Sequence, residues 1–258
     1  MDFREALTAV YLHSPCNVLP NPLWKTTSQI DQHHSSFQTE GEVITELSLW
    51  NEKQLLLYWK PGYQQMEYTH FGSPSLVLVH QDALPHFPSG QYSQKTAYFR
   101  YLHSMDDLPT PASHPDFDLV EADPQQQASQ VASLINRCYP NMTLDEAAIR
   151  SWTHHPTFRS DLWVWTIERK TGLPAALGIA EYDGNISEGA LEWIQVLPEY
   201  RRQGLGQQLV GALLLRLKGS VQFTTVSGQV DNPTRPGSLY RKCGFTGDDL
   251  WWVLRKGP

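Results

Sequence analysis

Apolar and polar positions follow their most regular pattern in the C-terminal half of the chain, between residues 191 and 218. Residues 191–196 form a short apolar segment that Pro198 closes, which is typical of a β-strand. Residues 199–206 then contain two arginines and two glycines. From Gln207 onward the apolar residues recur at helical spacing, at Leu209, Val210, Leu213, Leu214 and Leu217. This pattern predicts a strand, a basic glycine-containing turn and a helix in succession.

The rest of the C-terminal half has equally clear periodicity. An amphipathic helix is predicted at residues 124–138, and Thr143 with Glu146 has the spacing of a capping box that begins a helix ending near Trp152. Strands are predicted at residues 117–121, 162–168, 174–182, 221–230 and 250–255. Residues 116–258 are therefore expected to follow the order β-α-α-β-β-β-α-β-α-β.

The N-terminal half is less regular. The pattern predicts a short helix at residues 3–12, a β-hairpin formed by 42–50 and 54–60, and strands at 75–80 and 97–103. Residues 108–115 contain three prolines and are predicted to be a linker. The expected domains are an N-terminal α+β domain at 1–107, the linker 108–115, and a second domain at 116–258.

Composition narrows the range of possible functions. The 258 residues are 40% hydrophobic and 18% charged, as expected for a globular protein, and the net charge of −7 argues against nucleic acid as the main partner. No segment resembles a signal peptide or reaches transmembrane length, so a cytoplasmic protein without membrane contact is expected. The cysteines Cys16, Cys138 and Cys243 lack metal-ligand spacing, and the adjacent His33 and His34 complete no ligand set, so no metal is predicted.

The basic turn has the properties of an anion site. The first amides of a helix have no intrahelical acceptor, and the helix dipole is positive at that end. Gly204 and Gly206 allow a close approach to these amides, and Arg201 and Arg202 add positive charge. A pyrophosphate is the predicted ligand. The dinucleotide-binding fingerprint does not fit, because Leu209 stands where its third glycine would be, and no Gly-Lys-Ser/Thr follows as a P-loop requires.

The turn resembles the coenzyme A pyrophosphate loop of the GNAT superfamily of acetyl-CoA-dependent N-acetyltransferases. That loop has the pattern Q/R-x-x-G-x-G/A after a strand that ends in a valine and a proline, which Arg201, Gly204, Gly206, Val196 and Pro198 match. A second match is formed by an asparagine and a Leu-Tyr-x-x-x-Gly-Phe segment, here Asn232, Leu239, Tyr240, Gly244 and Phe245. The interval from Asn232 to Tyr240 is one residue longer than usual, and the Pro236-Gly237 pair predicts a short helix.

The resemblance covers residues 116–258 and implies an α/β (α+β) GNAT fold, with a mixed central sheet flanked by helices and a smaller N-terminal α+β domain. It implies acetyl-CoA as the co-substrate and no metal. The cofactor-binding residues that it implies are Val196, Arg201, Arg202, Gln203, Gly204, Leu205, Gly206, Gln207 and Asn232. Two interpretations of the N-terminal domain stay open: a degenerate half of the same fold, or a cover for the acceptor site.

Transfer of an acetyl group to an amine requires that the amine is neutral when it attacks and that the departing thiolate receives a proton. Glu192 is the candidate base, because strict alternation along its strand places it on one face with Ile194 and Val196. The alternative is that Glu192 only binds substrate or pairs with an arginine. Tyr240 is the candidate acid, and the alternative is that its ring only packs beside Phe245.

The acceptor pocket is expected around residues 136–156. Tyr139, Trp152, His154 and His155 lie there, and Trp193 lies on the central strand; such aromatics suit a cationic amine. Cys243 is interpreted as a small buried hydrophobic residue and not as a nucleophile. The predicted function is N-acetylation of a small-molecule or peptide amine, and the alternative is a non-catalytic module that binds coenzyme A or acyl-CoA. The oligomeric state stays open between monomer and homodimer.

Overall fold

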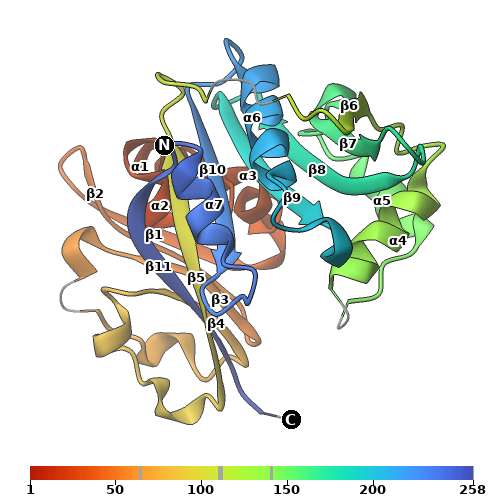
Figure 1. Ribbon diagram of the computed structural model, residues 1–258. Coiled ribbons are helices and arrows are strands. Elements are labelled where there is room, and N and C mark those ends of the chain that lie inside the picture. Colours follow the sequence, from red (N-terminus) through yellow and green to blue (C-terminus); the bar gives the residue numbers. More distant parts are fainter. Residues whose placement is uncertain (64–65, 110–112, 140–141, 258) are drawn as a thin grey trace. The chain divides into compact units, whose positions relative to one another are not determined.

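The computed structural model describes residues 1–63, 66–109, 113–139 and 142–257 (Figure 1). The chain forms two compact units. Unit 1 contains Met1–Leu102, Ser227–Gly237 and Gly247–Pro258, and unit 2 contains His103–Val226 and Ser238–Thr246. Among the described residues, no helix is long and apolar enough to cross a membrane.

The order of elements predicted for the C-terminal half is confirmed. The elements are β6 (Phe117–Glu121), α4 (Ala128–Cys138), α5 (Glu146–Trp152), β7 (Trp163–Glu168), β8 (Pro174–Asp183), β9 (Glu188–Val196), α6 (Leu205–Leu217), β10 (Phe223–Gln229), α7 (Pro236–Lys242) and β11 (Thr246–Arg255). Pro236 begins α7 because a proline at the first helical position loses no intrahelical hydrogen bond, and the helix is as short as predicted.

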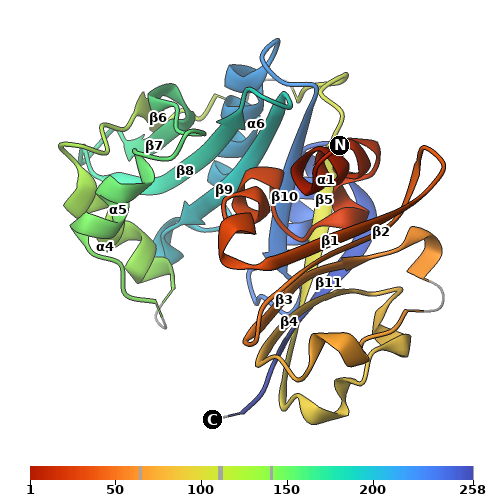
Figure 2. The ribbon, with the colours of Figure 1, turned by 180° about the vertical axis from the view of Figure 1, so that it is seen from behind.

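The sheet of unit 2 is mixed. Strands β6, β7, β8 and β9 pair antiparallel in that order, and β9 pairs in parallel with the first part of β10. Figures 1 and 2 show α6 on one face of β8 and β9, and α4 with α5 on the other. Gly178 on β8 allows the α6 contact, since a Cβ there would lie 3.1 Å from Leu213 Cδ1. On the opposite face, α4 and α5 cover a core that includes Trp163, Trp165 and Ile179.

The start of α5 differs from the prediction. Asp145, and not Thr143, is the N-cap, because its carboxylate accepts a hydrogen bond from the amide of Ala148 at 2.8 Å. The capping-box prediction at Thr143 is therefore wrong, although the helix ends at Trp152 as predicted.

Unit 1 combines short helices with its own part of the sheet. The helices are α1 (Phe3–His13), α2 (Pro15–Val18) and α3 (Leu23–Thr27), and the strands are β1 (His34–Glu40), β2 (Val43–Trp50), β3 (Gln54–Trp59), β4 (Leu76–His80) and β5 (Gln94–His103). The strand order is β1-β2-β3-β4-β11-β5. The predicted helix 3–12 and the hairpin of β2 and β3 are confirmed.

The compact units divide the chain differently from the predicted domains, which assigned all of 116–258 to the second domain. Strand β11 pairs antiparallel with β4, with Trp251 opposite His80, and so belongs to unit 1. The segment Ser227–Gly237 also belongs to unit 1, where the amide of Val230 donates to Ala97 O at 2.9 Å. Residues 110–112 of the predicted linker 108–115 lie outside the described residues.

Candidate functional site

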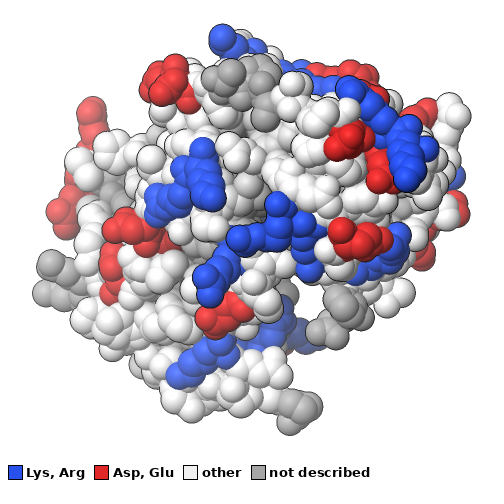
Figure 3. Space-filling view, viewed as in Figure 1, with Lys and Arg blue, Asp and Glu red and all other residues white. Residues whose placement is uncertain are grey.

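The turn between β9 and α6 has an unusual backbone. After the 3₁₀ turn η7 (Pro198–Tyr200), Arg202 has φ 66° and Gly204 has φ 85°, both in the left-handed region. Gly204 is the N-cap of α6, and no side chain caps the first helical amides. Figure 3 shows Lys and Arg side chains on the face that carries this turn. Uncapped amides at a positive helix end, next to basic residues, form a site suited to an anion.

Gly206 lets two other elements approach the start of α6. A Cβ at Gly206 would lie 3.1 Å from Leu239 Cδ2 on α7 and 3.9 Å from Val196 Cγ2 at the end of β9. A side chain at this position would therefore separate the helix start from α7. The space over Gly204 is open, since a Cβ there would meet no atom within 4 Å.

Arg201 and Arg202 occupy different environments. The Nε of Arg201 donates a hydrogen bond to Val196 O at 3.1 Å, so this half-buried side chain holds the end of β9. Burial raises the pKa of the neighbouring Cys138 thiol, an effect that the Arg201 guanidinium partly offsets. Arg202 is exposed. Of the two predicted phosphate ligands, Arg202 is thus the one whose side chain extends into solvent beside the turn.

A β-bulge lies at Glu192. The register of β9 with β8 passes from Trp193, opposite Ile179, to Leu191, opposite Ala180, so the register skips Glu192. A bulge breaks the alternation of side chains. Because the register shift lies at Glu192, alternation alone does not place Glu192 on the face of Ile194 and Val196, and that shared face stays a prediction. The parallel register with β10 also ends at Leu191, one residue before the bulge.

Tyr240 lies on α7 and is buried, with 6% of its surface exposed. Its ring packs edge to face against Phe245, with the centroids 5.7 Å apart. Burial raises the pKa of Tyr240, and Tyr139, Cys243 and Glu192 raise it further, so the phenol stays neutral. The structure therefore brings Glu192 and Tyr240 within electrostatic range of each other.

Cys243, one turn beyond Tyr240, is 1% exposed. Burial raises the pKa of its thiol to about 11, which keeps the sulfur protonated at neutral pH. This agrees with its interpretation as a buried hydrophobic residue.

Asn232 does not lie in the same unit as the other predicted site residues. It belongs to the Ser227–Gly237 segment of unit 1. Its Oδ1 accepts hydrogen bonds from the amide of Thr234 at 2.9 Å and from the Thr234 hydroxyl at 2.7 Å. The side chain therefore stabilises a local turn.

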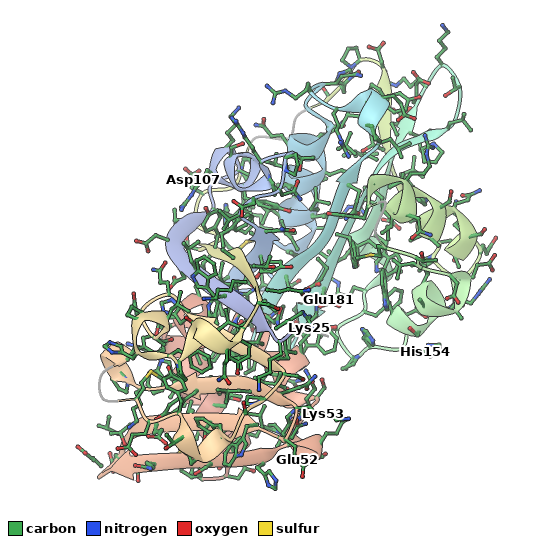
Figure 4. All side chains as sticks on the ribbon, turned by 90° about the horizontal axis from the view of Figure 1, so that it is seen from below. Lys25, Glu52, Lys53, Asp107, His154 and Glu181 are labelled. Atoms are coloured by element: carbon green, nitrogen blue, oxygen red, sulfur yellow. The ribbon has the colours of Figure 1, made fainter. Side chains whose placement is uncertain are left out.

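The aromatic residues predicted to line the acceptor pocket pack against one another. Trp152 and Trp193 are stacked with centroids 5.3 Å apart, and Tyr139 meets Trp193 edge to face at 6.0 Å. His155 Nδ1 lies 4.0 Å from Glu181 Oε1 on β8, whereas His154 is exposed on the loop that follows α5 (Figure 4). The side chains of Tyr139, Trp152 and Trp193 are partly buried against the core beneath α4 and α5, and residues 140–141 lie outside the described chain.

One residue that the sequence did not indicate is His103. Its imidazole is 2% exposed, packs against Phe245 at 5.3 Å, and accepts a hydrogen bond at Nδ1 from the amide of Met105 at 2.9 Å. Burial lowers the pKa of His103, although Asp106 and Asp107 oppose this. The neutral imidazole of His103 thus packs against the segment that follows Tyr240. The sequence did not indicate this role, because a single histidine forms no recognisable pattern.

No potential metal site, defined as a group of at least three His, Cys, Asp or Glu side chains, occurs in the described part of the chain.

Comparison with known proteins agrees with the fold. Residues 159–247 match the family model described as an acetyltransferase (GNAT) domain, which confirms the predicted family for these residues. The chain has no significant match among curated protein sequences.

Several solved structures have a similar fold. A GCN5-related N-acetyltransferase from Sphaerobacter thermophilus has a TM-score of 0.63 and 14% identity, with 83% of this chain and 76% of that chain covered. A GNAT-family acetyltransferase from Colwellia psychrerythraea has a TM-score of 0.63 and 12% identity, with 100% and 98% covered. A tandem GNAT protein from the clavulanic acid biosynthesis pathway has a TM-score of 0.53 and 14% identity, with 87% and 84% covered. The predicted GNAT fold is confirmed.

Proposed function

We propose, from the premise that residues 159–247 form a GNAT acetyltransferase domain, that this protein is an N-acetyltransferase. It would transfer the acetyl group of acetyl-CoA to a primary amine of a small molecule or peptide by direct attack. The observation that carries the proposal is the start of α6, where a left-handed Gly204 precedes uncapped helical amides under open space.

The residues of this turn fit the coenzyme. The amides of residues 203–207 would bind the pyrophosphate, and the exposed Arg202 would add charge. The amide of Val196, at the end of β9, would donate to the thioester carbonyl as charge develops on its oxygen. When bound, acetyl-CoA supplies the thioester that accepts the amine. Asn232 is less well supported as a ligand, because its amide oxygen is already hydrogen-bonded to Thr234.

Glu192 and Tyr240 are proposed to move the two protons. The amine nitrogen forms a bond to the carbonyl carbon while the carbon–sulfur bond breaks. Glu192 takes the proton that the amine loses, directly or through water, and Tyr240 donates a proton to the leaving sulfur. The bulge supports this role of Glu192, because it removes the residue from the regular ladder with β8. The neutral phenol of Tyr240 supports the role of donor.

The acceptor is proposed to be a cationic amine that enters beside the aromatic cluster. Trp152, Trp193 and Tyr139 are only partly buried, so their exposed surfaces can contact an ammonium group through cation–π interaction. This supports a class of acceptor and not a particular compound.

Unit 1 is proposed to be a degenerate half of the same fold. Its strands β1, β2 and β3 pair antiparallel and β3 then pairs in parallel with β4, as β7, β8, β9 and β10 do in unit 2. The connection from β3 to β4, however, has only the 3₁₀ turns η2 (Pro61–Tyr63) and η3 (Thr69–Phe71) among its described residues, where unit 2 has α6. The described part of this connection therefore provides no α-helix start for an anion.

The proposal predicts one coenzyme site per chain with catalytic turnover. Isothermal titration with acetyl-CoA is expected to give a stoichiometry of about one, because the β9–α6 turn has the required helix start and the described part of the β3–β4 connection does not. Thiol release measured over a panel of primary amines is expected to identify an acceptor. Binding without turnover on any amine would favour the non-catalytic module, and the absence of binding would contradict both functions.

The two arginines are expected to respond differently to substitution. Arg202→Gln should raise the Kd for coenzyme A roughly fivefold, about 1 kcal/mol, and should weaken its salt dependence, as expected for an exposed charge. Arg201→Gln removes the hydrogen bond to Val196 O and should lower the free energy of unfolding by about 1 kcal/mol. Calorimetry at two salt concentrations and thermal denaturation measure these effects. If both variants changed the salt dependence of the Kd equally, the assignment of Arg202 to coenzyme binding and of Arg201 to a structural hydrogen bond would be contradicted.

A further inference from the structure

Strand β1 is exposed on both faces. It lies at one end of the strand order, next to β2 only, and Phe37 is its one residue that is even half-buried (Figure 2). Within the described chain, the backbone groups on the side away from β2 have no strand partner. Such an edge is a template for pairing with another strand.

The sequence of β1 does little to prevent such pairing. Edge strands are usually protected by charged side chains, above all lysine, by proline, by a bulge in the edge strand, or by a covering helix or loop. Residues 34–40 contain no lysine, arginine or proline. The register with β2 shifts between Gln38, opposite Glu46, and Thr39, opposite Ile44, so the extra residue lies on β2 and β1 itself has no inserted residue. By contrast, the edge strand β6 of unit 2 carries two carboxylates, and Asp118 is bound by Arg169 at 2.8 Å.

The sequence of β1 is complementary to itself. In an antiparallel pair centred on Phe37, the two Phe37 rings lie opposite each other at the two-fold axis. Ser36 then faces Gln38, Ser35 faces Thr39, and His34 faces Glu40. Aromatic pairs and hydrogen-bonding polar pairs both stabilise neighbouring antiparallel strands.

We propose that β1 is a dimerisation strand that pairs antiparallel with β1 of a second copy of this chain. The interface is isologous, so each pair away from the axis forms twice and the Phe37 pair forms once, and the two sheets become continuous through the axis. Seven residues from each chain make a small interface, for which a reversible dimer with a Kd in roughly the micromolar range is expected. The proposal does not depend on the proposed enzymatic function, because β1 lies in unit 1 and the candidate catalytic residues lie in unit 2.

Sedimentation velocity of the full chain over a range of concentrations tests the proposal. The wild-type chain is expected to dimerise as its concentration rises. Phe37→Asp places two carboxylates opposite each other at the axis and should raise the dimer Kd by about tenfold or more. Leu173→Asp is the matched control, because Leu173 is 60% exposed in the turn between β7 and β8 of unit 2 and should leave the Kd unchanged.

A charge exchange tests the register. His34→Glu should weaken self-association because it places two carboxylates opposite each other, and the double variant His34→Lys/Glu40→Lys should weaken it because it places two ammonium groups there. An equimolar mixture of the two variants should restore dimers, because the introduced carboxylate of one copy then faces the introduced ammonium group of the other. A wild-type chain that stays monomeric at its highest attainable concentration, a dimer that withstands Phe37→Asp, or a mixture without recovery would each overturn the proposal.

Discussion

Gly204→Ala is expected to raise the Kd for coenzyme A by about tenfold or more, while the free energy of unfolding falls by only about 1–2 kcal/mol. Gly204 has φ 85°, and a residue with a Cβ is strained in this left-handed conformation. No atom of the protein lies within 4 Å of the new methyl group, so no clash in the free protein contributes. The loss of affinity arises from the strained backbone and from the methyl group itself, which occupies space that the anion would use. Relief of the strain would rotate the amides at the start of α6 away from a common anion. Titration calorimetry and thermal denaturation measure the two quantities.

Gly219→Ala is the matched control for this substitution. Gly219 follows the other end of α6 and has φ 77°, and a Cβ placed there would also meet no atom within 4 Å. The strain in the folded state should therefore be similar, and the loss of stability should be similar as well. Of these two glycines, only Gly204 adjoins the uncapped amides, so only its variant should lose affinity. Equal losses of affinity in both variants would indicate a general effect on α6 and would contradict an anion site at the turn.

Local patterns in the sequence were sufficient to predict the strand, turn and helix of the candidate site. Apolar spacing set the limits of α6 to within two residues at each end, since a buried helix face requires that spacing. The two glycines indicated the turn, because Gly204 adopts a positive φ and Gly206 contacts Leu239 closely. The positive φ is a property that a glycine supplies by itself, whereas the contact with Leu239 depends on the distant helix α7.

Features that depend on pairing between distant segments could not be predicted in this way. The bulge at Glu192 exists only in the register between β8 and β9, and no property of Glu192 itself indicates it. Strand β11 has a clear strand pattern, yet the pattern does not reveal that β4 is its partner. The assignment of Asn232 to unit 1 also involves a distant segment, since the amide of Val230 in the same part of the chain donates to Ala97 O on β5. Strand β1 was missed because its exposed residues are mostly polar and show no apolar alternation.

Tyr240→Phe is expected to lower kcat by about 100-fold, with KM changed by less than about twofold, because only the proton donor is removed. The ring can still pack against Phe245, so stability should change by no more than about 1 kcal/mol. Burial raises the pKa of Tyr240 above the ordinary tyrosine value of about 10. The phenol therefore stays protonated at any lower pH, and ionisation of Tyr240 should not reduce wild-type activity below about pH 10. Steady-state kinetics over roughly pH 6 to 9 should find the same fractional loss at each pH.

Tyr182→Phe is the control for this variant, because it removes a hydroxyl from the same unit and keeps the ring over which Arg159 lies at 5.1 Å. Its kcat should equal that of the wild type. A Tyr240→Phe enzyme with full turnover would leave Tyr240 only its packing role beside Phe245, and the leaving sulfur would then take its proton from water. Loss of activity in both variants would point to disturbed packing in unit 2, since the two hydroxyls share no role in the proposed reaction.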